Sequence, residues 1–336
     1  MNLIILGGKI VNRTDQKRTT KRKNKKNIIL LSILVVILAI VGIVGGYAYA
    51  MFSKVEKVKL DKSNLGINDE LSGKYGHITN IALFGVDSAE EGESGRSDSM
   101  MIATVDKKNK KLKVTSLMRD SYVDIKGHGK NKLNSAYAFG KEELAINTIN
   151  ENFDLNIENF VTVDFSSLPK IIDKIGGVDI DVDAAELKHI NNYIDDLNNR
   201  TGTKSSYVSG IGMKKLNGVQ AMAYCRIRYT VGDDYKRTER QREVVEDMLN
   251  KILKISPTKY SGLLNEILPM VKTSLSAGEI LSLSTDVVSI GNNLEQDRFP
   301  RDNSIKEETI NGMACLTFDK NTTQKEMHNW LFEDIK

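Results

Sequence analysis

Past residue 80 the chain alternates between short apolar runs and segments with apolar residues at helical spacing. Gly, Asp, Ser or Lys bound the apolar runs, which is typical of strands in a largely buried sheet. Strands are predicted at 81–86, 100–105, 112–118, 160–165 and 178–182, and helices at 144–153, 168–175, 237–253, 263–271 and 280–290. Because helix and strand alternate, we expect an α/β fold in α-β-α layers, with a mixed central sheet flanked by helices.

The segments around these elements are more polar. Residues 192–212 are rich in Asn, Asp, Ser, Thr and Gly, which indicates an exposed loop. Near the C-terminus the pattern predicts an edge strand at 313–318 and a short helix at 324–332. We expect the following division of the chain outside the N-terminal segment: a stalk at 53–77, the main domain at 78–255, and a helical extension at 256–336 that packs on it or follows it.

The apolar segment before residue 53 predicts one membrane span. Residues 28–52 are 25 consecutive residues without a charged side chain, and a helix of that length exceeds the roughly 30 Å of a hydrocarbon core. The tail at 1–27 holds nine Lys or Arg against one Asp, which favours the cytoplasmic side. We expect a single-pass protein of the cell membrane with a cytoplasmic N-terminus and the main domain outside. A cleaved signal peptide is the alternative, since Ala48-Tyr49-Ala50 resembles a cleavage site, although the apolar run exceeds the usual signal core.

The distribution of charge gives no support for nucleic-acid binding. The cations of the tail account for more than the whole net charge of +4, so the rest of the chain is net negative. We interpret the basic tail as a topology signal, with the lipid bilayer as an expected partner and nucleic acid excluded. The two cysteines, Cys225 and Cys315, lie far apart without a framework pattern, which favours buried free thiols over a disulfide.

Familiar catalytic motifs are absent from the sequence. The four histidines have no HExxH spacing, and there is no CxxC, no Walker lysine loop and no GxSxG elbow. These absences exclude zinc hydrolases, NTPases and serine hydrolases of the usual kinds.

Two carboxylates are expected to meet at one end of the sheet. Asp87 closes the first predicted strand and Asp98 opens the second, so an antiparallel pair would bring them together. Mg²⁺ typically takes one or two carboxylates and completes its shell with water and substrate phosphate. The alternative is that Asp87 is a turn residue and Asp98 a capping or edge residue.

Cationic side chains stand at the ends of several predicted elements. Arg119 follows the third strand, where α/β sheets tend to bind ligands. The others are Lys132, the pair Arg226 and Arg228, which point the same way if extended, and the set Arg237, Arg240 and Gln241 on one face of a helix start. Any one of them is ordinarily a solvated surface residue. Together they indicate phosphate, because arginine forms forked bonds to phosphate and gathered like charges need an anion.

The motifs around these residues resemble the LytR-CpsA-Psr family of cell-wall glycopolymer ligases. The resemblance runs from about residue 80 to 253 in the family's order: NIALFGVD, GRSDSMMIATVD, KVTSLMRDSYVDI, NKLNSAYAFG, VTVDF, IGGVDIDV, LNGVQAMAYCRIRY and DDYKRTERQR. It departs at Met118, where the family usually has proline, and at Asn131, where an aspartate commonly precedes the lysine. The second departure removes a possible partner of Lys132.

The resemblance implies a phosphotransferase, a transferase of phosphorus-containing groups. It would move a teichoic acid or a capsular or secondary wall polysaccharide from a polyprenyl-pyrophosphate carrier to peptidoglycan, with Mg²⁺. It also implies the roles of individual residues. Asp87 and Asp98 would be metal ligands, Asp234 would complete the site, and the pyrophosphate would be bound or oriented by Arg96, Arg119, Lys132, Arg226, Arg228, Arg237, Arg240 and Gln241.

A transfer outside the membrane, where no ATP is available, must use a bond already activated in the donor. The leaving polyprenyl phosphate is a stabilised anion, so it needs neutralising cations more than a proton. We therefore expect Arg119, Asp98 and Asp234 to be catalytic, with Asp234 or Asp98 accepting the proton of the attacking hydroxyl. Two alternatives remain: a hydrolase that passes the lipid pyrophosphate to water, and a noncatalytic membrane-anchored module that binds wall polymer or regulates.

Overall fold

The computed structural model describes residues 3–6, 9–12, 54–87, 95–228 and 233–336, and the chain divides into two units. The first, residues 1–53, contains a described antiparallel hairpin of β1 (Leu3–Leu6) and β2 (Lys9–Asn12). The predicted span at 28–52 and most of the predicted tail lie outside the described residues. Within the described ranges, no helix combines the length and apolar character needed to cross a membrane. The second unit, residues 54–336, contains everything that follows.

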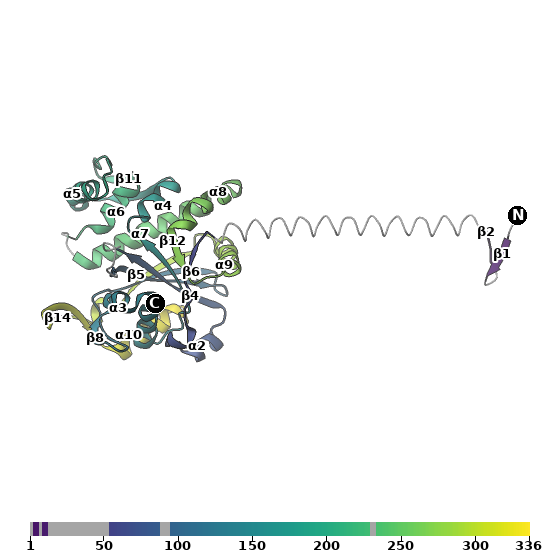
Figure 1. Cartoon of the computed structure of the whole chain (residues 1–336), viewed down its shortest axis with the longest axis horizontal. Coiled ribbons are helices and arrows are strands. Elements are labelled where there is room, and N and C mark those ends of the chain that lie inside the picture. Colours follow the sequence, from purple (N-terminus) through teal and green to yellow (C-terminus); the bar gives the residue numbers. More distant parts are fainter. Residues whose placement is uncertain (1–2, 7–8, 13–53, 88–94, 229–232) are drawn as a thin grey trace. The chain divides into compact units, whose positions relative to one another are not determined.

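A mixed sheet forms the centre of the second unit (Figure 1). Among the described residues its strands are, in spatial order, β13 (Leu294–Phe299), β6 (Lys111–Leu117), β5 (Ser97–Asp106), β4 (Ile78–Val86), β9 (Asn159–Asp164), β12 (Val271–Thr273) and β3 (Glu56–Lys57). The pairs β4–β5, β5–β6 and β9–β12 are antiparallel, whereas β4–β9, β6–β13 and β3–β12 are parallel. The predicted mixed α/β sheet is confirmed.

Helices cover both faces of this sheet (Figure 1). One core contains α2 (Asp69–Lys74), α3 (Leu133–Phe153) and α10 (Lys320–Leu331), whose apolar side chains pack with those of β4 and β5. The other contains α4 (Leu168–Lys174), α5 (Ala184–Thr201), α6 (Gly218–Arg226) and α7 (Asp233–Lys254) around the hairpin of β10 (Val178–Val182) and β11 (Gly212–Leu216). These two cores give the expected α-β-α layering.

The expectation of a helical extension after residue 255 is wrong. That region does hold α8 (Pro257–Ile267), α9 (Ala277–Ile290) and α10, but β12 and β13 complete the central sheet. The polarity pattern missed β13 because its sequence, LEQDRF, has no apolar run, and only Phe299 is fully buried. Trp330 of α10 is buried and its indole Nε1 donates to Thr115 Oγ1 at 2.8 Å. The C-terminal region is therefore part of the domain core.

The predicted stalk at 53–77 is also wrong, because this segment belongs to the domain. It includes β3, the single turn η1 (Lys62–Asn64) and α2. Leu65, Leu71 and Tyr75 are buried members of the first core. These few apolar side chains have no regular spacing in a polar sequence, so periodicity did not reveal that they are buried.

The predicted loop at 192–212 is helical over its first half, where α5 continues to Thr201. Asp183 and Glu186 form a capping box at the start of this helix, and Ile190 and Ile194 bury one face. The remaining face is rich in Asn and Asp, and this composition favoured a loop. The helix ends at Gly202, whose φ of 68° suits a residue without a side chain.

Among the described residues of the second unit, three short hairpins lie outside the central sheet. They are β10–β11, the pair β7 (Tyr122–Ile125) and β8 (Gly129–Lys132), and the pair β14 (Ile305–Ile310) and β15 (Met313–Phe318). The last strand confirms the prediction at 313–318. Cys225 and Cys315 are both buried and free, as expected.

Replacement of Gly218 by alanine is expected to destabilise the fold. A Cβ at this position would lie 1.9 Å from the Pro169 carbonyl oxygen, so α4 and α6 would have to separate. We expect a loss of about 1–3 kcal/mol or more in the free energy of unfolding, measured by urea denaturation. The control is Gly262→Ala in α8, where a Cβ meets no atom within 4 Å. It should be neutral or stabilising by up to about 1 kcal/mol, and equal effects of the two changes would contradict the packing argument.

Candidate active site

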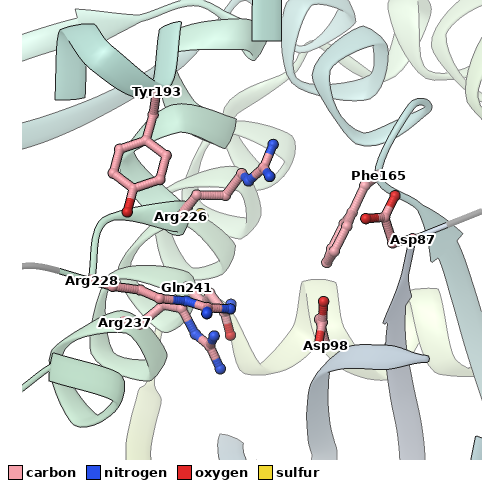
Figure 2. Close-up of a pocket in the computed structure, with 9 residues that line it drawn as sticks. Asp87, Asp98, Phe165, Tyr193, Arg226, Arg228, Arg237 and Gln241 are labelled. Atoms are coloured by element: carbon pink, nitrogen blue, oxygen red, sulfur yellow. The ribbon is translucent and has the colours of Figure 1, made fainter. Parts of the chain in front are cut away.

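A polar pocket of about 260 Å³ lies where the ends of β4 and β5 face helices α5, α6 and α7. Its lining residues are Asp87, Asp98, Phe165, Tyr193, Cys225, Arg226, Arg228, Arg237 and Gln241. We call it the arginine pocket. Figure 2 shows the two aspartates with Phe165 on one side and the three arginines with Tyr193 and Gln241 on the other. Six of the residues singled out in the sequence are thereby brought together.

The two carboxylates reach this pocket because of the strand register. Strands β4 and β5 are antiparallel, as expected, and their pairing passes from Gly85↔Ser99 to Val86↔Ser97. Asp98 is therefore the extra residue of a β-bulge, a feature that redirects side chains near active sites. Gly85 has a steric reason to be glycine, since a Cβ there would lie 2.9 Å from the Phe165 ring. Asp87, Asp98 and Phe165 thus form one surface at the ends of the interior strands β4, β5 and β9.

Behind Asp98 lies a chain of alternating charges. Arg119 Nη1 donates to Asp98 Oδ1, and Arg119 Nε lies 3.4 Å from Asp120 Oδ2. Lys132 Nζ in turn lies 2.9 Å from Asp120 Oδ1. Arg119 and Lys132 are not among the lining residues of the arginine pocket. Asp120 supplies the partner that Lys132 lacks at Asn131, whose own side chain accepts from Lys132 N and Ser135 Oγ at the start of α3.

The helical side supplies the cations. Arg226 is the last residue of α6, so residues 226–228 are not extended throughout, which was the condition for the two arginines to point the same way. The chain leaves the helix at Ile227, with φ −59° and ψ 126°, and both arginines still line the pocket. Arg226 Nη1 lies 3.4 Å from Asp196 Oδ2 of α5. Arg237 and Gln241, one turn apart on α7, complete this wall.

Arg240 does not line the pocket, which corrects its grouping with Arg237 and Gln241. It is 2% exposed, and its Nε donates to Glu186 Oε1 at 2.7 Å. Its Nη1 donates to the carbonyl oxygen of Ile227 at 3.1 Å. Since Ile227 stands between Arg226 and Arg228, Arg240 fixes the backbone that carries them. Arg240 therefore positions the pocket arginines and does not face the pocket itself.

Two predicted residues are not placed in the site. Arg96 is exposed and is not a lining residue of the pocket. Asp234 belongs to the first turn of α7, but its side chain lies outside the described residues. The proposed roles of both remain predictions.

The carboxylates of the pocket supply only part of the ligand shell of a divalent cation. Asp87 and Asp98 both line the pocket, but among the described residues no three Asp, Glu, His or Cys side chains gather as a closed metal cage. Mg²⁺ sites commonly use one or two carboxylates and take the remaining oxygens from substrate phosphate and water. The residues present fit a cation of that kind, held together with a phosphorylated ligand.

Sequence reasoning missed three lining residues: Phe165, Tyr193 and Cys225. Cys225 adjoins Arg226 but was interpreted as a buried thiol, and Phe165 was interpreted as the last residue of the strand predicted at 160–165. Tyr193 fell in the segment predicted as a loop. Burial raises the pKa of the Cys225 thiol to about 12, and the Glu243 carboxylate adds to this effect.

Loss of the Arg240 side chain is expected to destabilise the domain strongly. Arg240→Met would leave the buried Glu186 carboxylate and the Ile227 carbonyl without their partner. We expect a loss of about 3–5 kcal/mol in the free energy of unfolding, measured by urea denaturation. The double variant Glu186→Gln/Arg240→Met should lose less, because the unpaired charge is gone. A single-variant loss below about 1 kcal/mol would contradict the assignment, since that is the scale of an exposed pair.

The Cys225 thiol is expected to resist alkylation in the folded protein. Its raised pKa keeps the thiol neutral at pH 8.5, whereas an unfolded cysteine has a pKa of about 8.5 and is half ionised there. Because the unfolded chain loses this proton first, the contribution of Cys225 to stability should fall as the pH rises above about 8.5. Iodoacetamide labelling followed by peptide mass spectrometry, with and without urea, measures the difference. Labelling of Cys225 at similar rates in both would contradict the prediction.

Comparison with known proteins agrees with the resemblance found in the motifs. The chain matches the LytR_cpsA_psr family over residues 43–330. It is 33% identical to the Enterococcus faecalis "Polyisoprenyl-teichoic acid--peptidoglycan teichoic acid transferase TagU", covering 83% of this chain and 88% of that protein. It is also 33% identical to the Staphylococcus aureus "Regulatory protein MsrR", covering 76% and 74%. The crystal structure of protein gbs0355 from Streptococcus agalactiae matches with a TM-score of 0.63 at 27% identity, over 79% of this chain and 91% of that one. The chain belongs to the LytR_cpsA_psr family.

Proposed function

We propose that this protein attaches a glycopolymer, a teichoic acid or a capsular or secondary wall polysaccharide, from a polyprenyl-pyrophosphate carrier to peptidoglycan. The observation that carries the proposal is the arginine pocket, in which Arg226, Arg228 and Arg237 face Asp87 and Asp98. Membership of the family and the name of the Enterococcus faecalis relative support it. The activity is that of a transferase of phosphorus-containing groups.

The pocket suits a pyrophosphate because three arginines, Arg226, Arg228 and Arg237, line the same wall. Arginine binds phosphate oxygens in forked pairs, and Gln241 adds an amide donor. A peptidoglycan hydroxyl attacks the sugar-proximal phosphorus, the new phosphoester bond forms, and the bond to polyprenyl phosphate breaks. The arginines neutralise the phosphate oxygens and the departing anion, so no protonated leaving group is needed.

Asp98 and Arg119 act as a unit at the sheet edge. The Arg119 guanidinium pairs with Asp98 and is itself held by Asp120, so the Asp98 carboxylate keeps one orientation toward the pocket. We propose that Asp98 or Asp234 accepts the proton of the attacking hydroxyl. Asp87 and Asp98 would hold Mg²⁺, which when bound supplies additional positive charge to the phosphate oxygens. Lys132 would support this arrangement through Asp120.

We further propose that the domain lies outside the cell membrane. The uncharged run at 28–52 and the basic tail at 1–27 support a single-pass anchor with a cytoplasmic N-terminus. This location matches the chemistry, since a lipid-linked pyrophosphate supplies its own activated bond. A regulatory role, suggested by the name of the Staphylococcus aureus relative, would not operate through direct DNA contact, because the chain beyond its tail is net negative.

Transfer by the full chain in detergent tests the proposal. The substrates are a short polyprenyl-pyrophosphoryl glycan and peptidoglycan oligomers with Mg²⁺, and mass spectrometry identifies the products. We expect a phosphodiester-linked glycan that disappears with EDTA. Released glycan phosphate alone would identify a hydrolase, and donor that is bound but unchanged would identify a binding module.

The same assay tests the role of Asp98. Asp98→Asn should lower kcat/KM by at least about 100-fold, the scale of a lost acid–base or charge-neutralising group. The matched control is Asp195→Asn in α5, whose carboxylate accepts from Tyr207 and is not a lining residue of the pocket. Equal rates for Asp98→Asn and the control would refute the assignment.

A further inference from the structure

Helix α7 separates the arginine pocket from a second cleft. Arg237 and Gln241 share one face of the helix, whereas Tyr235, Glu239 and Arg242 share the opposite face. That opposite face, together with Arg298 at the end of β13, lines a cleft of about 500 Å³. An adjoining hollow of about 400 Å³ shares Tyr235 and Glu307 with it. We call the two together the Tyr235 groove, and their size is that of a ligand site.

The Tyr235 groove extends to the back of the candidate active site. Its hollow is lined by Asp120. Asp120 pairs with Arg119, and Arg119 pairs with Asp98, which lines the arginine pocket. The distance between the groove and the pocket is thus spanned by one arginine side chain. A ligand in the groove therefore lies within a few residues of the carboxylate expected to act on the attacking hydroxyl.

The cleft contains an arginine, Arg242, whose hydrogen bonds are incomplete. Arg242 donates from Nη1 to Ser116 Oγ at 2.9 Å, but its Nε is buried and has no hydrogen-bond partner among the described residues. Burial lowers the pKa of the Arg242 guanidinium, and the nearby Arg298 cation lowers it further. The Cζ atom of Arg298 lies 4.3 Å from the centroid of the Tyr235 ring, and the Arg298 guanidinium pairs with Asp302. Two neighbouring guanidinium groups of this kind favour an anion between them.

Acidic side chains limit the charge of that anion. Glu239 pairs with Lys236 at 2.7 Å, Asp302 pairs with Arg298, and the Tyr235 hydroxyl donates to Glu307 at 3.4 Å. Burial raises the pKa of Tyr235, and Glu307 adds to this effect, so the hydroxyl stays neutral. Three carboxylates along the lining would repel a doubly charged phosphate but accept hydrogen bonds from hydroxyl and amide groups. The lining therefore suits a polar ligand with a singly charged carboxylate.

We propose that the Tyr235 groove binds the acceptor, a saccharide strand that carries carboxylates, with one carboxylate on Arg242. The proposal rests on the proposed function, because it assigns the second substrate of that reaction to a separate groove. Hydroxyl and amide groups of the strand bind Glu239, Asp302 and Glu307. Peptide-free stretches of peptidoglycan glycan have this chemistry, because a muramic acid lactyl group is a free carboxylate where no stem peptide is amide-linked to it. The donor and the acceptor then lie on opposite faces of α7, and the Asp120–Arg119–Asp98 chain of ion pairs links their sites.

The test uses the full chain with a peptide-free tetrasaccharide of alternating N-acetylglucosamine and N-acetylmuramic acid. A second acceptor is the same tetrasaccharide with its carboxyl groups reduced to alcohols. The variant is Arg242→Gln, which retains a donor for Ser116, and Arg298→Gln serves if the first fails to fold. The matched control is Arg301→Gln, because Arg301 pairs with Asp297 at 2.6 Å and is not a lining residue of the groove.

We expect Arg242→Gln to raise the acceptor KM at least about tenfold, the scale of a charged hydrogen bond. The donor KM should stay near that of the wild type, and Arg301→Gln should match the wild type in both. Reduction of the carboxyl groups should raise the acceptor KM of the wild type by a similar factor and should change the acceptor KM of Arg242→Gln little. The proposal is overturned if the donor KM rises equally, if the variant remains sensitive to carboxyl reduction, or if a phosphorylated saccharide binds more tightly.

Equilibrium binding of the tetrasaccharide without donor separates this proposal from the proposed function. If the wild type binds the tetrasaccharide but shows no transfer, and Arg242→Gln does not bind it, the groove proposal is supported and the proposed ligase function is refuted. If the wild type transfers the glycan while Arg242→Gln and Arg298→Gln both bind the tetrasaccharide as tightly as the wild type does, the groove proposal is refuted. The proposed ligase function is not refuted by that result.

Discussion

The buried ion pair between Glu186 and Arg240 holds together the helical wall of the site. Glu186 also caps α5, so the same carboxylate fixes the start of one helix and receives a guanidinium from another. Arg240 then uses a second nitrogen to bind the Ile227 carbonyl, where the chain leaves α6. Because three helices meet through two side chains, the positions of Arg226, Arg228 and Arg237 are set by contacts that lie outside the arginine pocket. A buried pair is costly to break, since either partner alone would be an uncompensated charge.

The two walls of the arginine pocket arise from different kinds of local structure. The sheet wall depends on hydrogen-bond register, because a single extra residue at Asp98 turns its carboxylate toward the pocket. The helical wall depends on periodicity and on where helices end. Negative charge thus lies at the ends of β4 and β5, and positive charge lies on α7, at the end of α6 and just beyond it. An anionic ligand between them would relieve repulsion among the arginines, which is the electrostatic reason why we propose a phosphate site here.

The C-terminal region links the site to the rest of the fold. Strand β13 lies parallel to β6 at the sheet edge and ends close to Arg298, whose guanidinium lies over Tyr235 of α7. The hairpin of β14 and β15 contributes Glu307, which Tyr235 contacts. Residues more than 40 positions beyond the end of α7 therefore shape its second face. A segment that was expected to be a helical extension instead builds one wall of the Tyr235 groove.

The local sequence pattern was enough to predict most strands of the central sheet and one wall of the site. Apolar runs located strands β4, β5, β6, β9 and β10, and strand-end positions indicated that Asp87 and Asp98 would meet. These features depend on neighbours in sequence, so periodicity and spacing suffice to find them. The buried segment that was predicted to be a stalk, the polar strand β13 and the second half of α5 were not recognised. Their burial comes from partners distant in sequence and not from their own composition. Only the tertiary structure distinguished Arg240 from Arg237, since the two share a helix and a residue type. Their difference lies in Glu186, which is 54 positions away in sequence and in direct contact in space.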